Sequence, residues 1–597
     1  MILPDDKLIS DEKHLVEIFN SHYINIVEKS SGTEPKVIDF DKEENKSSLL
    51  EGILSNFVDH ESITLIKENA CSDGIKFKFE NIDENTVSKC FNQLKTSIST
   101  GSDKIPAKLV KISKNYLVKP LTEAINSSIK SHTFPHAAKI AAVTPLDKGG
   151  KNKNDVLNFR PVSVLNVFSK FFEWIMKQQI NNFMEQHFSR YLSAYRQNYS
   201  TQHVLLRLLE EWKCDLDNNF VVGAILMDLS KAFDCVPHDL IIAKLAAYGF
   251  DNSSLHYVLS YLTNRNQATR INGFYSSHQV LKSGVPQGSI LGPIIFNIFL
   301  NDIFYFIDNL HNYADDSTIT CSSNSIENLV ASLETETDKA LRWLNINKMI
   351  VNPDKFQCII CTKDKSANKD IECRVGNKII KSETSVKLLG VRIDNQLKFE
   401  EHVKNICRKA SSQLNALYRI RDFIPRETRQ VLCNSFVSAN FYYCPLIWHF
   451  CSALAANKIE NIHKRALRFV LNDFKSPYEI LLSSAKKDPM RTIRLKFLCT
   501  EIFKCINNIG PSFMQNIFRL KADSRIMRTS YINNLIVPVK KTVTFGKKSI
   551  SSIGPSVWNK LPAHMKLCKS LCNFKKMLKQ WNGELCSCHL CKKKFYL

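Results

Sequence analysis

Three aspartates stand at the ends of apolar segments in this 597-residue chain. Asp228 lies at the end of the apolar run FVVGAILMDL at 220–229, and Asp315 and Asp316 belong to Tyr-Ala-Asp-Asp at 313–316. Burial of an unpaired charge is costly, and two adjacent carboxylates also repel each other. A divalent cation removes both penalties, and Mg²⁺ prefers hard oxygen ligands such as carboxylates. The three aspartates therefore predict a magnesium site.

A site of this kind serves phosphoryl transfer. Two ions held about 3.5–4 Å apart activate the attacking oxygen and stabilise the leaving one, and nucleotide phosphates complete their coordination. The alternative is that Asp315 and Asp316 form a solvent-exposed turn, because Asp is common in turns. The upstream Asp228 and the motifs described below favour the metal site.

These aspartates must be positioned by a buried strand and a neighbouring hairpin. Apolar runs predict the strands, and the spacing of apolar residues along one face predicts the helices. We expect strands at 220–229, 309–322 (two strands joined by a tight turn), 356–362 and 386–394, and helices at 15–27, 237–248, 289–306 and 325–344.

The composition indicates a globular, basic protein. Lys and Arg number 81 and Asp and Glu 58, and the net charge of +23 attracts polyanions such as nucleic acid or an acidic membrane surface. A solvated basic surface is the alternative. The length of 597 residues predicts about two to four packed units, and 44% hydrophobic residues is a globular value.

The cellular environment is predicted from the cysteines and from the start of the chain. The 19 cysteines follow no repeating frame, and no basic-then-apolar signal pattern opens the chain, so we expect an intracellular protein, nuclear or cytoplasmic, with mostly reduced thiols. An uncharged stretch at 430–457 contains Asn434, Asn440 and Pro445, which are costly in lipid. We expect a buried helical pair there and no membrane span.

The order of the motifs resembles that of reverse transcriptases of non-LTR retrotransposons, of the jockey-like kind. The YADD sequence and the upstream strand aspartate resemble the signature of these enzymes, and segments near 496–517 and 546–562 resemble the tail that follows their polymerase. The resemblance covers residues 100 to about 580. The ordered blocks are GSDKIPAK (101–108), NFRPVSVL (158–165), AYRQNYSTQH (194–203), LMDLSKAFDCVPHD (226–239), GVPQGSILGP (284–293) and VKLLGVRID (386–394).

The resemblance implies an α+β right-hand polymerase with fingers, a palm built on an antiparallel sheet, a thumb and a mainly helical C-terminal extension. The expected domains are a polar, helical N-terminal segment at 1–97, fingers and palm at 98–395, a helical thumb at 396–470 and the extension at 471–597.

The resemblance also implies roles for the acidic residues. Asp228 and Asp315 would ligate both metal ions, with Asp316 beside them and the backbone carbonyl of Leu229 as a minor ligand. The implied cofactor is a pair of Mg²⁺ ions, which Mn²⁺ could replace. Lys355 stands where the family often has a lysine proposed to protonate the leaving pyrophosphate. Here Phe356 follows it where many relatives have Thr, and a surface lysine is an equal alternative.

The implied nucleotide site begins with Phe233, a flat apolar wall that favours deoxyribose over ribose; a packed core Phe is its alternative. Gln287, between Gly284 and Gly288, would lie near the incoming nucleotide and template, and a simple helix-entry turn is its alternative. Arg160 matches a basic position that meets the triphosphate.

Lys148 matches a second such position, but it lies in DKGGKNKN, where a solvated basic loop is the alternative. Leu388, Leu389 and Gly390 resemble the turn that holds the primer end. The basic helices after residue 396 would then follow the duplex through phosphate contacts.

The expected reaction is template-directed addition of dNTPs to a primer 3′-OH, with an RNA template and a DNA primer or target as partners. A catalytically lost or domesticated nucleic-acid-binding remnant is the alternative function, against which the intact aspartates argue. An intron maturase or a telomerase-like protein is a further alternative, against which the tail after residue 470 argues.

Complete non-LTR proteins usually carry an endonuclease, either as a large N-terminal domain or after the polymerase beside a zinc knuckle. About 100 residues precede the polymerase segment, so we expect the N-terminal type to be absent and the chain to be a partial product. The sequence CSCHLC at 586–591 is too compact for the usual knuckle and predicts reactive or incidental thiols. Cys358 and Cys361 are expected on opposite faces of a strand, which argues against a shared metal.

Overall fold

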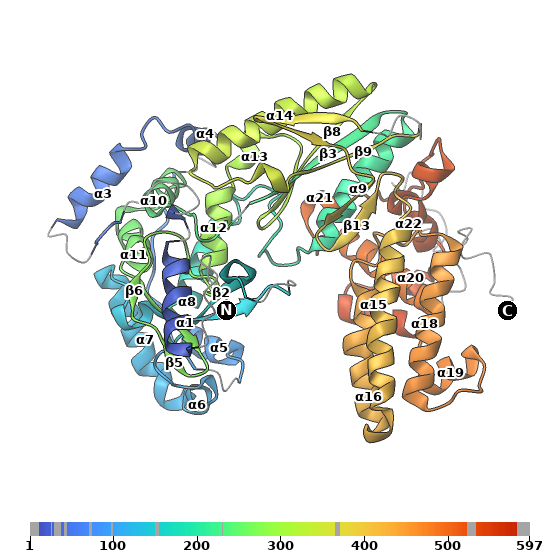
Figure 1. Ribbon diagram of the computed structural model, residues 1–597, viewed down its shortest axis with the longest axis horizontal. Helices are drawn as coiled ribbons and strands as arrows, with labels where there is room; N and C mark the ends of the chain where they lie inside the picture. The colour runs from blue at the N-terminus through green and yellow to red at the C-terminus, as the bar shows by residue number, and fades with distance from the viewer. Residues whose placement is uncertain are drawn as a thin grey trace. The chain divides into compact units, whose positions relative to one another are not determined.

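The computed structural model describes residues 11–25, 27–28, 37–40, 45–70, 74–96, 100–149, 154–229, 231–364, 370–521 and 533–581 (Figure 1). These residues fall into two compact units, which are described separately below. Unit 1 comprises the described residues within 1–189, 229–308 and 339–352, and unit 2 those within 190–228, 309–338 and 353–597. The domain boundaries expected at residues 97, 395 and 470 stay predictions.

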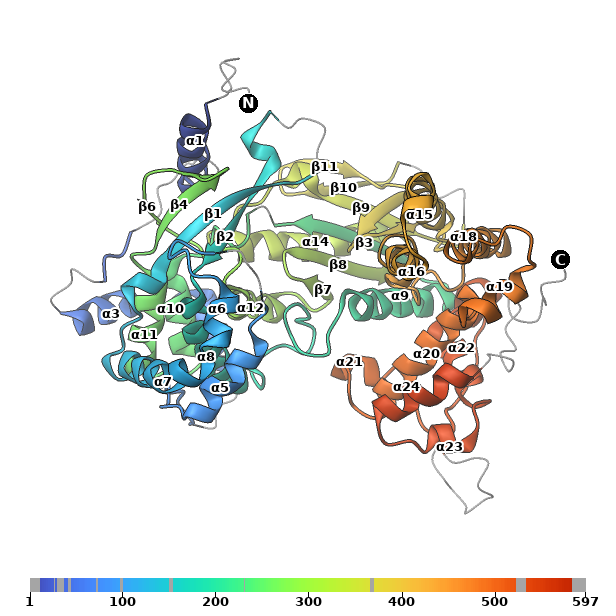
Figure 2. The same ribbon diagram turned by 90° about the horizontal axis from the view of Figure 1, so that it is seen from below.

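A four-stranded antiparallel sheet organises unit 2, in the order β7-β8-β3-β9 (Figure 2). Its strands are β3 (Val221–Asp228), β7 (Leu310–Tyr313), β8 (Asp316–Ser323) and β9 (Gln357–Cys361). An antiparallel sheet and its strands at 220–229, 309–322 and 356–362 are as the sequence predicts.

Strand β3 is a continuous apolar run because both of its faces are covered. Val222, Ala224 and Leu226 pack into a core shared with α9 (Thr201–Asp217). On the alternate face Gly223 meets α14 (Ile326–Ile346), where a Cβ at position 223 would lie 2.7 Å from Leu333 Cδ1. The strand that carries Asp228 is therefore fixed from both sides.

The core of unit 2 extends from this sheet through the helices that follow it. Buried side chains of α9, β9, β12, β13, α15, α18, α20, α22 and α24 form one continuous hydrophobic cluster. The remaining elements of unit 2 are β10 (Glu372–Val375), β11 (Lys378–Lys381), β12 (Ser385–Leu388), β13 (Val391–Asp394), α15 (Glu400–Arg419), α16 (Arg426–Leu432), a π-helix (Cys433–Ser438), α17 (Ala439–Tyr442), α18 (Ala453–Leu471), α19 (Tyr478–Ala485), α20 (Met490–Ile506), α21 (Ser512–Gln515), a second π-helix (Val543–Lys547), α22 (Ile550–Trp558), α23 (Ala563–Lys566) and α24 (Leu571–Gln580).

Two carboxylates of α9 form hydrogen bonds with the backbone of residues 541–551. Asp217 accepts hydrogen bonds from the backbone N–H of Lys541 (3.1 Å) and of Thr542 (2.7 Å). Glu210 accepts from the N–H groups of Ile550 (2.7 Å) and Ser551 (2.9 Å) at the start of α22, where a negative charge also complements the helix dipole. Helix α9 thus joins the four-stranded sheet to the C-terminal helices.

Unit 1 contains a five-stranded sheet with the path β2-β1-β4-β5 and with β6 paired to β4. Helix α1 packs on β4 through Asn20, whose side chain donates to Ser277 O (2.9 Å) and accepts from Gln267 Nε2 (3.3 Å). The elements are α1 (Glu12–Ile24), α3 (Lys46–Ser55), α4 (Glu61–Asn69), α5 (Glu84–Gln93), α6 (Ala107–Ile112), α7 (Lys114–Ser131), β1 (Ile140–Asp147), β2 (Phe159–Leu165), α8 (Val167–Met184), α10 (His238–Ala247), α11 (Asn252–Leu262), β4 (Asn266–Ile271), β5 (Phe274–Tyr275), β6 (Gln279–Val280), α12 (Gly292–Leu300) and α13 (Ile303–Phe306).

Three expected elements differ from the structure. In the stretch 430–457, expected to be a buried helical pair, helical structure ends at Tyr442 and resumes only at Ala453, and Val431 and Phe436 are exposed. The helix expected at 289–306 is two helices separated at Asn301 and Asp302, and the side chain of Asn301 bonds to Ser189 N (2.7 Å) and Tyr248 Oη (2.9 Å) outside them. The strand expected at 386–394 is a hairpin, β12–β13, that turns at Leu389 and Gly390. Of the helices among the described residues, none combines the length and apolar character needed to cross a bilayer.

Candidate active site

The aspartates singled out in the sequence come together on two paired strands of unit 2. In the β3–β8 register Asp228 stands directly opposite Asp316. Ala314 and Asp315 form the two-residue turn between β7 and β8, and Ala314 takes a left-handed conformation with φ +59°. Residues directly opposite in an antiparallel pair have Cβ atoms about 4.5–5.5 Å apart. Asp228 and Asp316 therefore share one edge of the sheet, and Asp315 adjoins them.

The charges at this edge influence one another. Burial raises the pKa of Asp316 to about 6, with further contributions from the negative charges of Asp315 and Asp228. Lys355 Nζ donates to Asp228 Oδ2 at 3.1 Å and brings one positive charge to the cluster. The side chains of this ion pair are 51% and 42% exposed, so it contributes only about 0–1 kcal/mol to stability.

A buried amide supports the turn that carries Asp315. The fully buried Asn312 donates from Nδ2 to Ala314 O (2.9 Å) and to Ser317 Oγ (3.0 Å). A left-handed conformation costs a non-glycine residue about 1–2 kcal/mol, and these hydrogen bonds hold the chain in it. Asn312 was missed in the sequence, although an Asn inside a strand is unusual enough to be a signal.

The donor set at this edge suits a hard cation. No three His, Cys, Asp or Glu side chains within the described ranges are arranged as they stand to hold a metal ion. The carboxylates of Asp228, Asp315 and Asp316 nevertheless offer only oxygen ligands, as Mg²⁺ prefers. Burial and, after it, the two neighbouring negative charges raise the pKa of Asp316, and a cation would favour its charged form. Leu229, whose carbonyl was expected as a further ligand, directly follows Asp228.

A second group of expected residues lies in unit 1. The ring of Phe233 stacks on Phe296 with 4.7 Å between ring centroids. Val285 N donates to Phe233 O (2.9 Å), and Gly284, at φ +78°, approaches so closely that a Cβ there would lie 2.6 Å from Asp234 O. The segment with Phe233 and the GVPQG segment are therefore in direct backbone contact.

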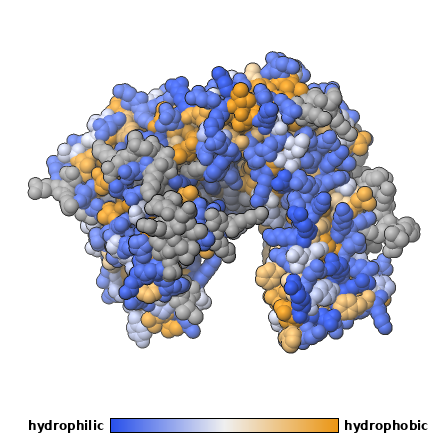
Figure 3. All heavy atoms as spheres, viewed as in Figure 1, coloured by the Kyte–Doolittle hydropathy of each residue, from blue (hydrophilic) through white to orange (hydrophobic). Residues whose placement is uncertain are grey.

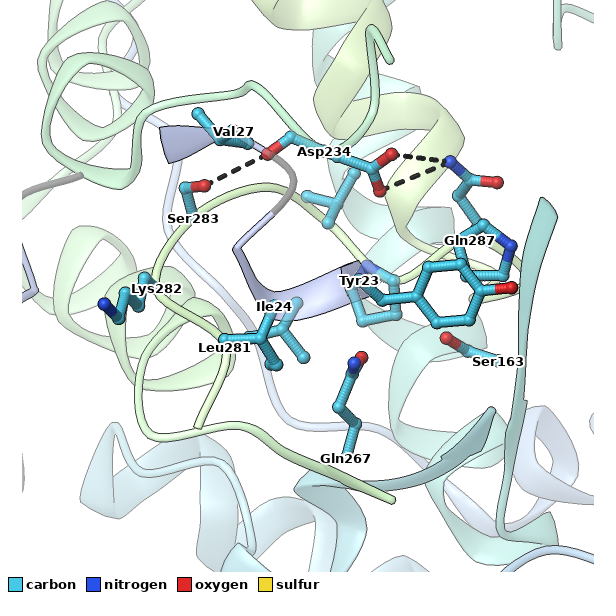
Figure 4. Close-up of a pocket in the computed structure, with 13 residues that line it drawn as sticks. Tyr23, Ile24, Val27, Ser163, Asp234, Gln267, Leu281, Lys282, Ser283 and Gln287 are labelled. Carbon is cyan, nitrogen blue, oxygen red and sulfur yellow. Dashed lines mark hydrogen bonds between the residues drawn. The ribbon is translucent and has the colours of Figure 1, made fainter. Parts of the chain in front are cut away.

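Gln287 connects this pair of segments to strand β2. Its carbonyl accepts from Ser163 N at 2.7 Å, and a Cβ on Gly288, at φ +114°, would lie 2.6 Å from Ser163 O. The side chain of Gln287 donates to the carboxylate of Asp234, a residue to which the sequence gave no role (Figure 4). Asp234 directly follows Phe233, and that adjacency was the available signal.

The two basic residues expected at the triphosphate lie at the end of the β1–β2 pair where the chain connects the two strands. Lys148 donates from Nζ to Leu157 O at 2.6 Å, and its positive charge opposes the burial that raises the pKa of Asp234. Lys148 therefore lies near Asp234 in unit 1. Arg160 is exposed in β2, opposite Leu146 of β1.

The expected primer turn is the turn of the β12–β13 hairpin. Leu389 and Gly390 both take positive φ values, +45° and +78°. Tyr443 donates from its hydroxyl to Leu389 O at 2.6 Å, and its ring lies 3.3 Å from where a Cβ of Gly390 would be. Leu388, the last residue of β12, is buried in the core of unit 2. Nothing in the sequence pointed to Tyr443.

A groove of about 550 Å³ opens beside this turn in unit 2. Its lining includes Lys387, Arg392 and Lys409 together with Tyr443. Figure 3 shows a largely hydrophilic surface over α15, the helix that carries Lys409. The groove therefore offers cations beside the primer turn.

Within the described residues the cysteines of β9 do not form a shared metal site. Cys361 packs in the core of unit 2, whereas the sulfur of Cys358 lies 3.7 Å from that of Cys373. The two cysteines of β9 thus occupy opposite faces, as expected. The CSCHLC sequence lies outside the described residues.

Comparison with known proteins confirms the resemblance seen in the motifs. Residues 151–393 match the family described as reverse transcriptase (RNA-dependent DNA polymerase). The probable RNA-directed DNA polymerase from transposon BS of Drosophila melanogaster is 26% identical over 379 residues, which are 61% of this chain and 41% of that protein.

The RNA-directed DNA polymerase from mobile element jockey of Drosophila melanogaster is 24% identical over 386 residues, 62% of this chain and 41% of that protein. The probable RNA-directed DNA polymerase from transposon X-element of the same organism is 22% identical over 361 residues, 59% of this chain and 39% of that protein. The chain thus spans about two fifths of the length of these relatives.

Proposed function

We propose that this chain, whose residues 151–393 belong to the reverse transcriptase family, is an RNA-directed DNA polymerase of a jockey-like non-LTR retrotransposon. One observation carries the proposal: the register that sets Asp228 opposite Asp316, with Asp315 in the adjoining turn. Intact acidic residues at this edge argue against a nucleic-acid-binding remnant that has lost catalysis. The substrates are dNTPs, an RNA template and a DNA primer or target.

The acidic edge of the sheet is the reaction centre in this proposal. Asp228 and Asp315, with Asp316 beside them and the Leu229 carbonyl as a minor ligand, hold two Mg²⁺ ions. When bound, these ions activate the primer 3′-OH and stabilise the leaving pyrophosphate. Lys355, which lies within hydrogen-bonding distance of Asp228, gives a proton to the leaving group in this proposal.

The residues of unit 1 select and hold the nucleotide in this proposal. Phe233, stiffened by its stacking on Phe296, provides the wall that excludes a 2′-hydroxyl. Arg160 and Lys148 supply positive charge to the triphosphate. Gln287 approaches the nucleotide between the two glycines that bring its backbone close to β2.

The arrangement proposed around these sites is that of a right-hand polymerase. The four-stranded sheet belongs to the palm, α15 to α18 form the thumb, and the described helices from α19 to α24 belong to the C-terminal extension. The turn at Leu389 and Gly390 holds the primer end. Exposed cations of α15, among them Lys404, Arg408 and Lys409, contact the phosphates of the duplex without reading its sequence.

Primer extension on an RNA template tests the proposal. Wild-type protein with Mg²⁺ is expected to incorporate dNTPs, and Asp315→Asn is expected to abolish incorporation, because it removes a carboxylate from the acidic edge. Asp338→Asn, which neutralises an exposed aspartate of α14, is the matched control and retains activity. Equal incorporation by wild type and Asp315→Asn contradicts the proposed site.

A further inference from the structure

The side chain of Gln287 is held by a carboxylate in unit 1. Its Nε2 donates to both carboxylate oxygens of Asp234, at 3.2 Å to Oδ1 and 3.1 Å to Oδ2. An ionised carboxylate can only accept hydrogen bonds, whereas a primary amide offers a donor nitrogen on one side and an acceptor oxygen on the other. Because Asp234 only accepts, the donor nitrogen Nε2 is the end of the Gln287 amide that faces it.

The consequence is a fixed orientation for the other end of the amide. With Nε2 turned to Asp234, Oε1 points away from the carboxylate, as Figure 4 shows. The two orientations of a glutamine amide have almost the same shape, so packing alone distinguishes them poorly. The charge of Asp234 supplies the distinction, and it leaves the acceptor Oε1 at the end of the Gln287 amide that is turned away from the carboxylate.

Asp234 is itself held in place by its surroundings. Ser283 Oγ donates to its backbone carbonyl at 3.1 Å, and Gly284 lies in van der Waals contact with its backbone. Burial raises the pKa of Asp234 to about 6, against the hydrogen bond from Gln287 and the positive charges of Lys231 and Lys148, which favour the charged form. The carboxylate is thus ionised at neutral pH, and a fall in pH to about 6 is enough to protonate it.

The N-terminal helix closes the pocket around this pair. Tyr23 and Ile24 of α1 line the same small cavity, of about 30 Å³, as Asp234 and Gln287 (Figure 4). The Tyr23 hydroxyl is buried and has no hydrogen-bond partner among the described residues. Burial and, after it, the negative charge of Asp234 raise the pKa of Tyr23, which stays neutral. Helix α1, to which the sequence assigned no role, therefore forms one wall of the pocket that contains Gln287.

We propose that Asp234 is a positioning residue that fixes the amide of Gln287 with its Oε1 as the acceptor presented to the incoming nucleotide, in a pocket that helix α1 completes. The inference rests on the proposed polymerase function. It adds a residue that touches neither metal nor substrate and acts only through Gln287.

Asp234→Asn is the isosteric test, because an Asn side chain both donates and accepts and so permits either orientation of Gln287. We expect the KM for dNTP to rise about tenfold, a factor near the lower end of what a hydrogen bond to a charged group contributes, while kcat changes less. Glu185→Gln, which neutralises an exposed carboxylate of unit 1 outside this pocket, is the control and keeps KM within about twofold.

A double-mutant cycle separates positioning from a general structural role. If Asp234 acts through Gln287, Asp234→Asn has no further effect on KM in a Gln287→Ala background, within about twofold. Equal effects of Asp234→Asn in both backgrounds overturn the inference. Absence of RNA-templated extension by the wild type, by contrast, overturns the proposed function itself.

The pH dependence of KM provides a second measurement, which needs no Asp234 variant and so remains available if Asp234→Asn fails to fold. The groups that face Asp234 are Lys231, Lys148, Tyr23 and Cys235, with Lys282 and its partner Glu28 at the edge of the pocket. Wild-type KM for dNTP is expected to rise as pH falls through about 6, where Asp234 takes up a proton. In Gln287→Ala this rise is lost, and a rise of equal size in both proteins contradicts the inference.

Discussion

A single methyl group at Gly284 tests how tightly the two segments of the nucleotide site are joined. A Cβ at this position would lie 2.6 Å from Asp234 O, 2.7 Å from Asp234 Cα and 2.7 Å from Phe233 O. These are backbone atoms, which cannot rotate away as the end of a side chain can. Gly284→Ala must therefore separate the two segments or strain both.

Gly273→Ala is the matched control, because Gly273 also has a positive φ, +93°, but a Cβ there meets nothing within 4 Å. Both substitutions carry the cost of a left-handed L-residue, about 1–2 kcal/mol. Only Gly284→Ala adds overpacking, typically about 1–3 kcal/mol. The difference in stability between the two variants therefore measures the cost of the close contact between Gly284 and the backbone of Phe233 and Asp234.

Thermal unfolding and nucleotide kinetics measure the difference. With about 2–4 °C per kcal/mol for a unit of this size, Gly284→Ala is expected to melt several degrees below Gly273→Ala. Its KM for dNTP should also rise, because Phe233 and Asp234 are displaced. Equal melting temperatures for the two variants would refute the close packing, and a KM unchanged in Gly284→Ala would refute its link to the nucleotide site.

Three further predictions concern other parts of the site. Phe233→Ala should admit ribonucleotides in primer extension, because the wall beside the sugar is lost; unchanged dNTP/rNTP selectivity contradicts its assigned role. Tyr443→Phe removes the hydrogen bond to Leu389 O and should raise the KM for primer–template about threefold, with the KM for dNTP unchanged, since such a bond contributes about 0.5–1.5 kcal/mol. Mg²⁺ should raise the melting temperature more at pH 7.5 than at pH 5, because the pKa of Asp316, raised to about 6, leaves this carboxyl protonated and its repulsion relieved at the lower pH; an equal rise at both pH values would argue against a cation at this edge.

The strands and turn of the acidic edge could be predicted because local sequence determines them. The apolar run of β3 and the turn at Ala314 and Asp315 are each visible within a few residues. The pairing of Asp228 with Asp316, however, depends on a register between distant segments, which the motif resemblance implied and periodicity alone did not.

The features that the sequence did not predict are polar contacts over long distances in the chain. The expected helix at 289–306 breaks where Asn301 bonds Tyr248 and Asp302 accepts from Lys244 Nζ at 2.6 Å, both inside unit 1. Asp234 and Tyr443 were likewise missed, because each bonds to a residue more than 50 positions away that only the fold brings near. Asn312 is the exception, since its partners Ala314 and Ser317 are local. Apolar periodicity records burial but not the partners of a buried polar group.

The attachment of α9 to the chain around residue 545 has a genetic consequence. One side of α9 packs on β3, the strand that ends in Asp228, and the carboxylates of Asp217 and Glu210 hold residues 541–551 on it. A premature stop codon after residue 470 would leave every recognisable polymerase motif in the reading frame. It would also remove the helices that pack on α9 and leave the carboxylates of Asp217 and Glu210 without their backbone N–H partners. Gene copies that retain all of these motifs but lack the C-terminal segment would therefore encode an unstable protein.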